Sequence, residues 1–138
     1  MGIVLAGVVF FVKSQKNKPI TKAPDQSTTT QLPEAKLEIS GVVVNNFLKS
    51  EIEKNEQGDS LLVDNSDYQI VYFPKTKEFI VSITDSPFNE IKQRAEKDLV
   101  SRLGVEKEEA CKFNVVITTP RFANPEEAGK VYKLSFCE

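Results

Sequence analysis

The sequence predicts an α+β domain over residues 37–138, with an antiparallel sheet of about five strands and helices on one face of it. Short segments in which apolar and polar residues alternate indicate strands, and one long segment with helical spacing separates them into two groups. The predicted order is an N-terminal helix followed by β-β-β-α-β-β. A chain of this length is enough for one modest hydrophobic core, so we expect a single folded domain.

The N-terminal helix is predicted at residues 42–54. Val44, Phe47, Leu48 and Ile52 follow a spacing that brings their side chains to one side of a helix. The alternative is a strand through residues 39–44, because Val42, Val43 and Val44 are β-branched. The spacing continues for more than two turns and favours the helix.

Three strands are predicted next, at residues 60–63, 68–73 and 79–84. Within the second and third segments, alternate positions carry large apolar side chains. Turn-forming residues separate the strands at Asp64–Asp67 and at Pro74–Lys77. The three segments therefore predict an antiparallel meander.

The clearest helix is predicted between Pro87 and Gly104, since proline is favoured in the first turn and glycine after the last one. One apolar stripe is expected to cover the sheet: Phe88, Ile91, Ala95, Leu99 and Leu103. Charged residues are assigned to the exposed sides: Lys92, Arg94, Glu96, Lys97, Asp98 and Arg102. A shorter helical turn is expected over residues 106–110.

The last two strands are predicted at residues 113–119 and 131–137, as an antiparallel pair joined by residues 120–130. In this register Cys111 and Cys137, which are the two cysteines of the chain, come close together at the open end of the pair. We expect a disulfide between them, which implies an oxidising compartment. The alternative is a pair of free buried thiols in a reducing compartment.

Residues 1–12 contain no polar side chain and are predicted to anchor the protein in a membrane. A spanning helix needs about 20 apolar residues, so this segment is either the C-terminal half of a span that begins upstream or a degenerate signal anchor. A buried strand or helix of the fold is the alternative. Residues 13–36 are rich in Lys, Thr and Pro and are predicted to form a disordered linker.

Two signals disagree about the side of the membrane on which the domain lies. Residues 1–36 carry five lysines and two acids, a net charge of +3, whereas residues 37–138 carry a net charge of −5. Lysines directly after an apolar segment favour a cytoplasmic domain. The predicted disulfide favours the opposite side, and we expect the domain outside the cytoplasm.

Several classes of function are excluded by composition. The chain has no histidine, which removes Ser-His-Asp, Cys-His and HExxH mechanisms. Two cysteines without histidine do not complete a zinc site, and no glycine-rich phosphate loop is present. A net charge of −2 gives no basis for binding nucleic acid. We therefore predict no catalytic residue, no metal and no cofactor.

The long loop at residues 120–130 is the candidate interaction surface. Long loops on a rigid sheet often carry binding function. Arg121 and Phe122 are residue types that anchor interfaces, and Asn124 lies beside them. The alternative is that Phe122 packs under the edge of the sheet and Asn124 only begins a turn.

Together these features predict a membrane-tethered, extracytoplasmic and non-catalytic module for binding, adaptor work or envelope assembly. Its expected partners are the membrane and a protein of the cell envelope. A carboxylate-based hydrolase is an alternative that rests on paired acids such as Glu126 and Glu127.

The layout also resembles that of type IV pilin-like subunits, which combine an apolar N-terminal segment, an α+β head and a C-terminal disulfide. The resemblance implies a filament or secretion subunit as a further alternative. Those subunits have a longer apolar helix and usually a glutamate near its start. Residues 1–12 contain no glutamate, so the resemblance is limited to the layout.

Overall fold

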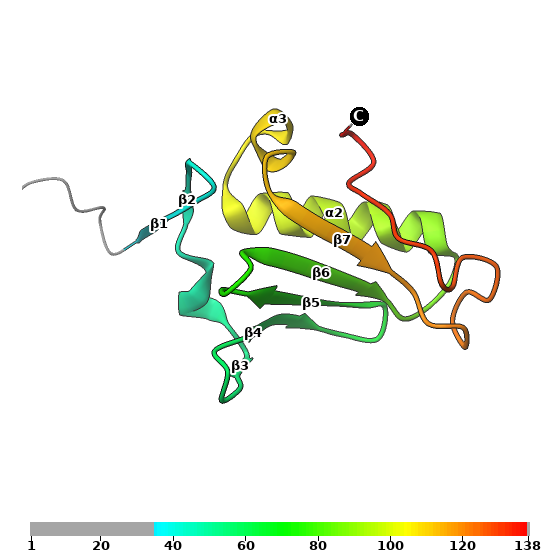
Figure 1. The fold of residues 1–138 in the computed structure, drawn as a ribbon. Coiled ribbons are helices and arrows are strands. Elements are labelled where there is room, and N and C mark those ends of the chain that lie inside the picture. Colours follow the sequence, from blue (N-terminus) through cyan, green and yellow to red (C-terminus); the bar gives the residue numbers. More distant parts are fainter. Residues whose placement is uncertain (1–34, 138) are drawn as a thin grey trace, which may run out of the picture. The chain divides into compact units, whose positions relative to one another are not determined.

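A computed structural model describes residues 35–137 of the chain (Figure 1). The fold is α+β, with a five-stranded mixed sheet, a two-stranded sheet and one main helix. The predicted α+β class is thus confirmed, and the main sheet has five strands as expected, although only four of them are strands that the sequence predicted. The predictions for residues 1–12 and for nearly all of residues 13–36 lie outside the described residues. Between residues 35 and 137, no helix has the length and apolar character that crossing a membrane requires.

A two-stranded hairpin opens the described part of the chain. It pairs β1 (Lys36–Ile39) with β2 (Val42–Asn45) in antiparallel fashion. Ser40 and Gly41 form the turn, with φ angles of 53° and 82°. Positive φ at both central positions is what a tight turn between twisted strands requires. β1 begins at Lys36, so regular structure starts at the last residue of the predicted linker.

The hairpin takes the place of the helix predicted at residues 42–54, and that prediction is wrong. Val42 and Val44 are buried while Val43 between them is 49% exposed, which is the two-residue period of a strand. The β-branched valines favour this extended conformation. A short 3₁₀ helix, η2 (Phe47–Ser50), is the helical structure that forms in this segment.

The main sheet contains five strands in the spatial order β3-β4-β5-β6-β7. Neighbouring strands from β3 to β6 are antiparallel, so the predicted meander is confirmed. β6 and β7 are parallel, and the prediction of a wholly antiparallel sheet is wrong at this position. The strand bounds are β3 (Glu53–Lys54), β4 (Ser60–Asp64), β5 (Tyr68–Phe73), β6 (Glu78–Ile83) and β7 (Asn114–Thr118).

The parallel pairing follows from the helix between the two strands. α2 (Phe88–Leu103) spans about 24 Å at 1.5 Å per residue, so it carries the chain back along the sheet before β7 begins. Gly104 ends the helix in the left-handed conformation with φ 67°, as its position predicts. The short helix α3 (Lys107–Ala110) follows and confirms the predicted turn.

α2 covers one face of the sheet with the predicted apolar stripe. Phe88, Ile91, Ala95, Leu99 and Leu103 are all buried. They pack in one core with inward-facing residues of the main sheet and of the hairpin. The helix therefore joins both sheets into one folded unit.

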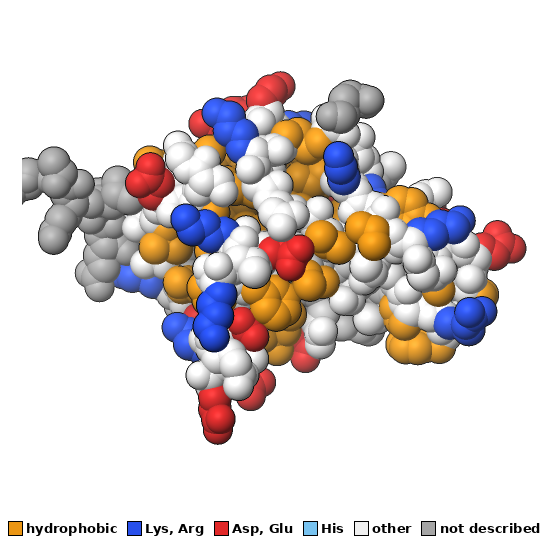
Figure 2. Space-filling model, viewed as in Figure 1, with side chains coloured by type: hydrophobic (Ala, Val, Ile, Leu, Met, Phe, Trp, Pro, Cys, Tyr) orange, Lys and Arg blue, Asp and Glu red, His pale blue; other side chains and the backbone are white. Residues whose placement is uncertain are grey.

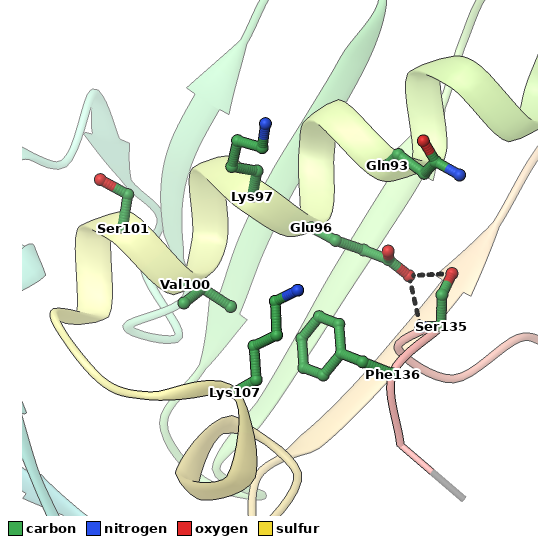
Figure 3. A pocket seen from close by; sticks show the side chains of 8 residues that line it. All are labelled: Gln93, Glu96, Lys97, Val100, Ser101, Lys107, Ser135 and Phe136. Atoms are coloured by element: carbon green, nitrogen blue, oxygen red, sulfur yellow. Dashed lines mark hydrogen bonds between the residues drawn. The ribbon is translucent and has the colours of Figure 1, made fainter.

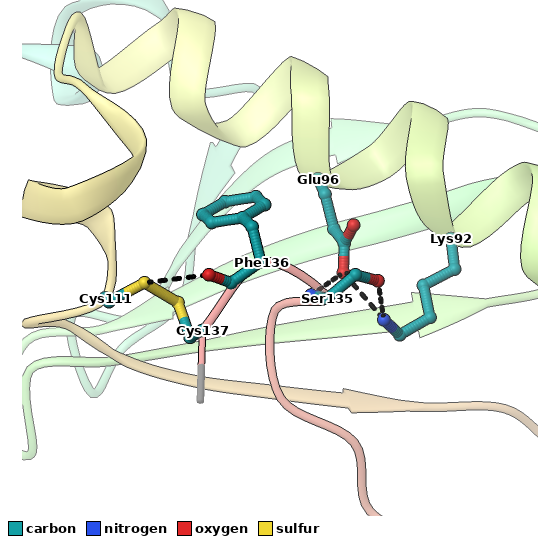
Figure 4. The surroundings of a disulfide bond; sticks show 6 residues. All are labelled: Lys92, Glu96, Cys111, Ser135, Phe136 and Cys137. Carbon is teal, nitrogen blue, oxygen red and sulfur yellow. Dashed lines mark hydrogen bonds and ion pairs between the residues drawn. A yellow bond between two sulfur atoms is a disulfide. The ribbon is translucent and has the colours of Figure 1, made fainter.

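Two charged residues of α2 contradict the predicted exposed surface. Lys92 and Glu96 are 7% and 4% exposed, although the sequence places them outside the apolar stripe. The C-terminal segment, residues 131–137, lies beside this part of the helix (Figure 4). The burial therefore comes from a segment far away along the chain.

The strand predicted at residues 131–137 does not form. Ile117 and Tyr132 make a single antiparallel bridge, with two backbone hydrogen bonds of 2.9 Å. After Tyr132 the chain leaves the edge of β7, and Leu134 is buried in the core. β3 at the opposite edge is the fifth strand instead.

The second face of the main sheet carries one apolar row. In Figure 1, β7 passes in front of α2, so the view looks onto this second face. Figure 2 keeps the view and shows hydrophobic side chains gathered among charged ones. The pairing of the strands aligns four half-buried residues across them: Leu61, Val71, Ile80 and Val116.

Candidate functional site

The C-terminal segment is held against α2 by a buried polar network (Figure 4). Lys92 Nζ lies 2.7 Å from Glu96 Oε2 and donates to Ser135 Oγ at 2.5 Å. Glu96 Oε2 accepts two more hydrogen bonds, from the backbone N–H of Ser135 at 2.7 Å and from its hydroxyl at 2.9 Å. Burying two charges is costly unless they are paired and hydrogen-bonded, and this network satisfies both conditions.

A disulfide holds the same segment at its end. Cys111, directly after α3, is bonded to Cys137, and their Cα atoms are 5.5 Å apart. The predicted disulfide is thus confirmed, although the strand that was expected to carry Cys137 is absent. The network and the disulfide lie on either side of Phe136 (Figure 4). They fix the path of the chain at two points close together.

A groove lies between α2, α3 and this anchored segment (Figure 3). We call it the α2–α3 groove, and its volume is about 480 Å³, which is within the range of ligand pockets. Glu96 and Ser135 lie at one end of it. Six further side chains line it: Gln93, Lys97, Val100, Ser101, Lys107 and Phe136.

The α2–α3 groove carries unbalanced positive charge. Lys97 and Lys107 are exposed, and neither forms an ion pair with another residue of the 35–137 range. Lys107 Nζ lies 5.3 Å from the centre of the Phe136 ring, a cation–π distance. The carboxylate of Glu96 is already compensated by Lys92. The groove is therefore cationic in a domain whose net charge is negative.

The loop singled out from the sequence lies elsewhere, at the start of α2. Arg121 is exposed, and Phe122 is 81% exposed instead of packed under the sheet edge. Asn124 is buried, and its side-chain amide donates to the carbonyl of Asp85 at 2.9 Å and to Thr119 Oγ1 at 2.8 Å. The loop thus presents the exposed ring of Phe122, and the hydrogen bonds of the buried Asn124 fix the loop to Asp85 and Thr119.

A second hollow, of about 630 Å³, separates this loop from the first turn of α2. Glu90, Glu126 and Glu127 lie around it, so it includes one of the acid pairs on which the hydrolase alternative rests. Glu127 Oε1 accepts a hydrogen bond from the hydroxyl of Tyr132, and it lies 3.8 Å from Nζ of Lys130. Among residues 35–137, no three acidic or cysteine side chains are grouped so as to hold a metal ion.

The shifted pKa values occur at ion pairs and tyrosines away from the α2–α3 groove. Burial, together with a hydrogen bond to Asp98, raises the pKa of Tyr68 to about 12. A hydrogen bond from Arg94 lowers the pKa of Asp67. The Tyr68–Asp98 and Arg94–Asp67 pairs connect α2 to β5 and to the turn before it, so we assign them a structural role.

Sequence reasoning did not identify the α2–α3 groove. Lys92 and Glu96 have the spacing of an ordinary surface ion pair, and nothing near them in sequence indicates burial. Lys97 and Lys107 look like solvated surface charges. The groove exists because residues 135–137 are brought to α2, and no local pattern encodes that contact.

Comparisons with known proteins give no match: none among protein-family models, curated proteins or solved structures.

Proposed function

We propose that this chain is a non-catalytic binding or adaptor module, tethered to a membrane by residues 1–12, whose folded domain works outside the cytoplasm. Its binding site is the α2–α3 groove. One observation carries the proposal: a disulfide and a buried ion pair together fix a short irregular segment as the wall of a cationic groove. Rigid support of this kind is what a binding site needs.

The chemistry of the groove favours binding over catalysis. Its side chains include two ammonium groups that form no ion pair within residues 35–137, an aromatic ring, a valine and neutral polar groups. Its one carboxylate, Glu96, is held in an ion pair and by two hydrogen bonds from Ser135. Acid–base catalysis needs a group that is presented to a substrate, and the carboxylate of Glu96 is buried and directed at Lys92 and Ser135.

The disulfide favours the extracytoplasmic side. Stable disulfides form in oxidising compartments and are rare in the cytosol, where thiols are kept reduced. Removing Cys111 or Cys137 would free the end of the groove wall, so the site itself depends on that compartment. We give the disulfide more weight than the lysines of residues 13–36, which favour a cytoplasmic domain. Those lysines also have a simpler explanation, since they keep a linker soluble.

Reporter fusions in a bacterial host test the tether and its orientation. Alkaline phosphatase, active only outside the cytoplasm, and a fluorescent protein that matures only inside it are each fused after residue 138. The proposal expects an active phosphatase and a dark fluorescent fusion, both in the membrane fraction. Deletion of residues 1–12 is the matched control and should abolish both phosphatase activity and membrane recovery. A bright fluorescent fusion with inactive phosphatase would contradict the proposal.

A further inference from the structure

We infer that the α2–α3 groove binds a peptide segment of a partner protein in which carboxylates flank an apolar side chain. The inference rests on the proposed function, because it names the chemistry of the partner that such a module would bind. Three features of the groove support it: its apolar interior, its charge and its unused hydrogen-bonding groups.

The interior of the groove fits an apolar side chain. Val100 and Phe136 are partly buried and line it, and the side chain of Lys107 lies between them in Figure 3. A volume of about 480 Å³ exceeds what one side chain fills, so neighbouring residues of the same segment also enter. Burial of one apolar anchor in a supported pocket is how most interfaces obtain their affinity.

The charge selects an acidic segment. The ammonium groups of Lys97 and Lys107 come from α2 and α3, on two sides of the groove, and neither has an ionic partner among residues 35–137. Carboxylates on either side of the apolar anchor would complement both. The same charge disfavours the chain's own N-terminal region as the occupant, because residues 1–36 carry a net charge of +3.

Unused polar groups favour a peptide over a lipid chain. The side chains of Gln93 and Ser101 line the groove and make no hydrogen bond to another residue of the described range. A peptide backbone offers both donors and acceptors to such groups. An acyl chain offers neither and would leave them unpaired on binding, at a cost in affinity.

Selection from a random decapeptide display library tests the inference. The target is the full oxidised chain in mild detergent, and selected peptides are synthesised and titrated by fluorescence anisotropy. The groove variant carries Lys97→Glu and Lys107→Glu. The matched control carries Lys75→Glu and Lys112→Glu, two exposed lysines outside the groove that undergo the same change of charge. Equal urea midpoints for the three proteins establish that the variants fold.

We expect selected peptides to be enriched in Asp and Glu around one apolar residue. Their affinity should fall about tenfold or more in the groove variant and less than about twofold in the control. Peptides without acidic enrichment, equal losses in both variants, or no binder at all would overturn the inference. Peptides that bind the groove variant undiminished would also overturn it, and would leave a binding role standing without support for its assignment to the charged groove. The reporter fusions test the tether and the orientation independently.

Discussion

The backbone N–H of Ser135 donates a 2.7 Å hydrogen bond to the carboxylate of Glu96, although the two residues are 39 positions apart. This contact ties the C-terminal segment to the middle of α2. Lys92 on the preceding turn of the helix balances the charge of that carboxylate. The wall of the α2–α3 groove is therefore supported by charges buried beneath it.

The contributions of Lys92 and Glu96 to the free energy of unfolding should be strongly coupled. Glu96→Leu leaves the ammonium group of Lys92 buried without its counter-charge, and we expect it to lower the free energy of unfolding by about 3–5 kcal/mol. The double variant Lys92→Met with Glu96→Leu removes both charges and should cost clearly less than the sum of the single variants. Urea unfolding of all four proteins at pH 7 measures the coupling.

An exposed ion pair of α2 provides the control for this cycle. Arg94 lies 2.7 Å from Asp67, and its side chain is mostly exposed. Arg94→Ala should lower the free energy of unfolding far less than Glu96→Leu does, because exposed ion pairs contribute little. A Glu96→Leu cost no larger than that of Arg94→Ala, or strict additivity in the cycle, would show that the buried network does not hold the segment.

In the loop at residues 120–130, Asn124 should contribute to the free energy of unfolding and Phe122 should not. Asn124→Ala removes the amide that bonds the carbonyl of Asp85 and the hydroxyl of Thr119, and we expect a cost of about 1–3 kcal/mol. Phe122→Ala should change the free energy of unfolding by less than about 0.5 kcal/mol, because its ring is exposed. Urea unfolding compares the two variants, and similar costs would contradict this assignment.

Local patterns were sufficient for much of the fold. The stripe of α2, the meander from β4 to β6 and the left-handed Gly104 each depend on residues close together in sequence. The antiparallel register predicted for residues 113–119 and 131–137 correctly placed Cys111 beside Cys137. The disulfide and the bridge between Ile117 and Tyr132 both agree with that register. Short-range periodicity and the positions of turn-forming residues are sufficient to predict these features.

The failures come from contacts between distant segments and from one ambiguous pattern. Val44, Phe47 and Leu48 fit a helical spacing by coincidence, while the Ser40–Gly41 turn and the valines determine a hairpin. The burial of Glu96 depends on Ser135, so it is invisible in the helix sequence alone. The candidate groove was missed for the same reason, since it lies where three separate segments meet.

Gly104 should tolerate alanine less well than Gly129. Both have positive φ, 67° and 85°, so either substitution strains the backbone by about 1–2 kcal/mol. At Gly104 an added Cβ would also lie 2.4 Å from Nδ2 of Asn45, whereas nothing is within 4 Å at Gly129. Gly104→Ala should therefore cost more in urea unfolding.

The excess cost at Gly104 should depend on its neighbour. In an Asn45→Ala background the clash is removed, and the cost of Gly104→Ala should approach that of Gly129→Ala. An unchanged cost in that background would contradict a clash with the Asn45 side chain as the source of the excess.

Stability should decline in alkali in part through Tyr68. Burial and the hydrogen bond to Asp98 raise its pKa to about 12 from the ordinary value near 10. Between these values the folded protein retains a proton that the unfolded chain has lost, so the free energy of unfolding falls as pH rises. Tyr68→Phe should flatten this decline between pH 10 and 12, measured by urea unfolding, and leave the pH dependence from 7 to 9 unchanged. Equal slopes in both proteins above pH 10 would contradict the assignment.

The redox state of Cys111 and Cys137 in cells tests the central claim most directly, because both the location of the domain and the wall of the groove depend on that bond. The full chain is expressed in a bacterial host, thiols are trapped in acid, and a mass-tagged alkylating agent is added under denaturing conditions with or without prior reduction. We predict that neither cysteine takes up the tag until the protein is reduced, and that both do so afterwards. Tagging of both cysteines without reduction would contradict the account and would place the domain in a reducing compartment.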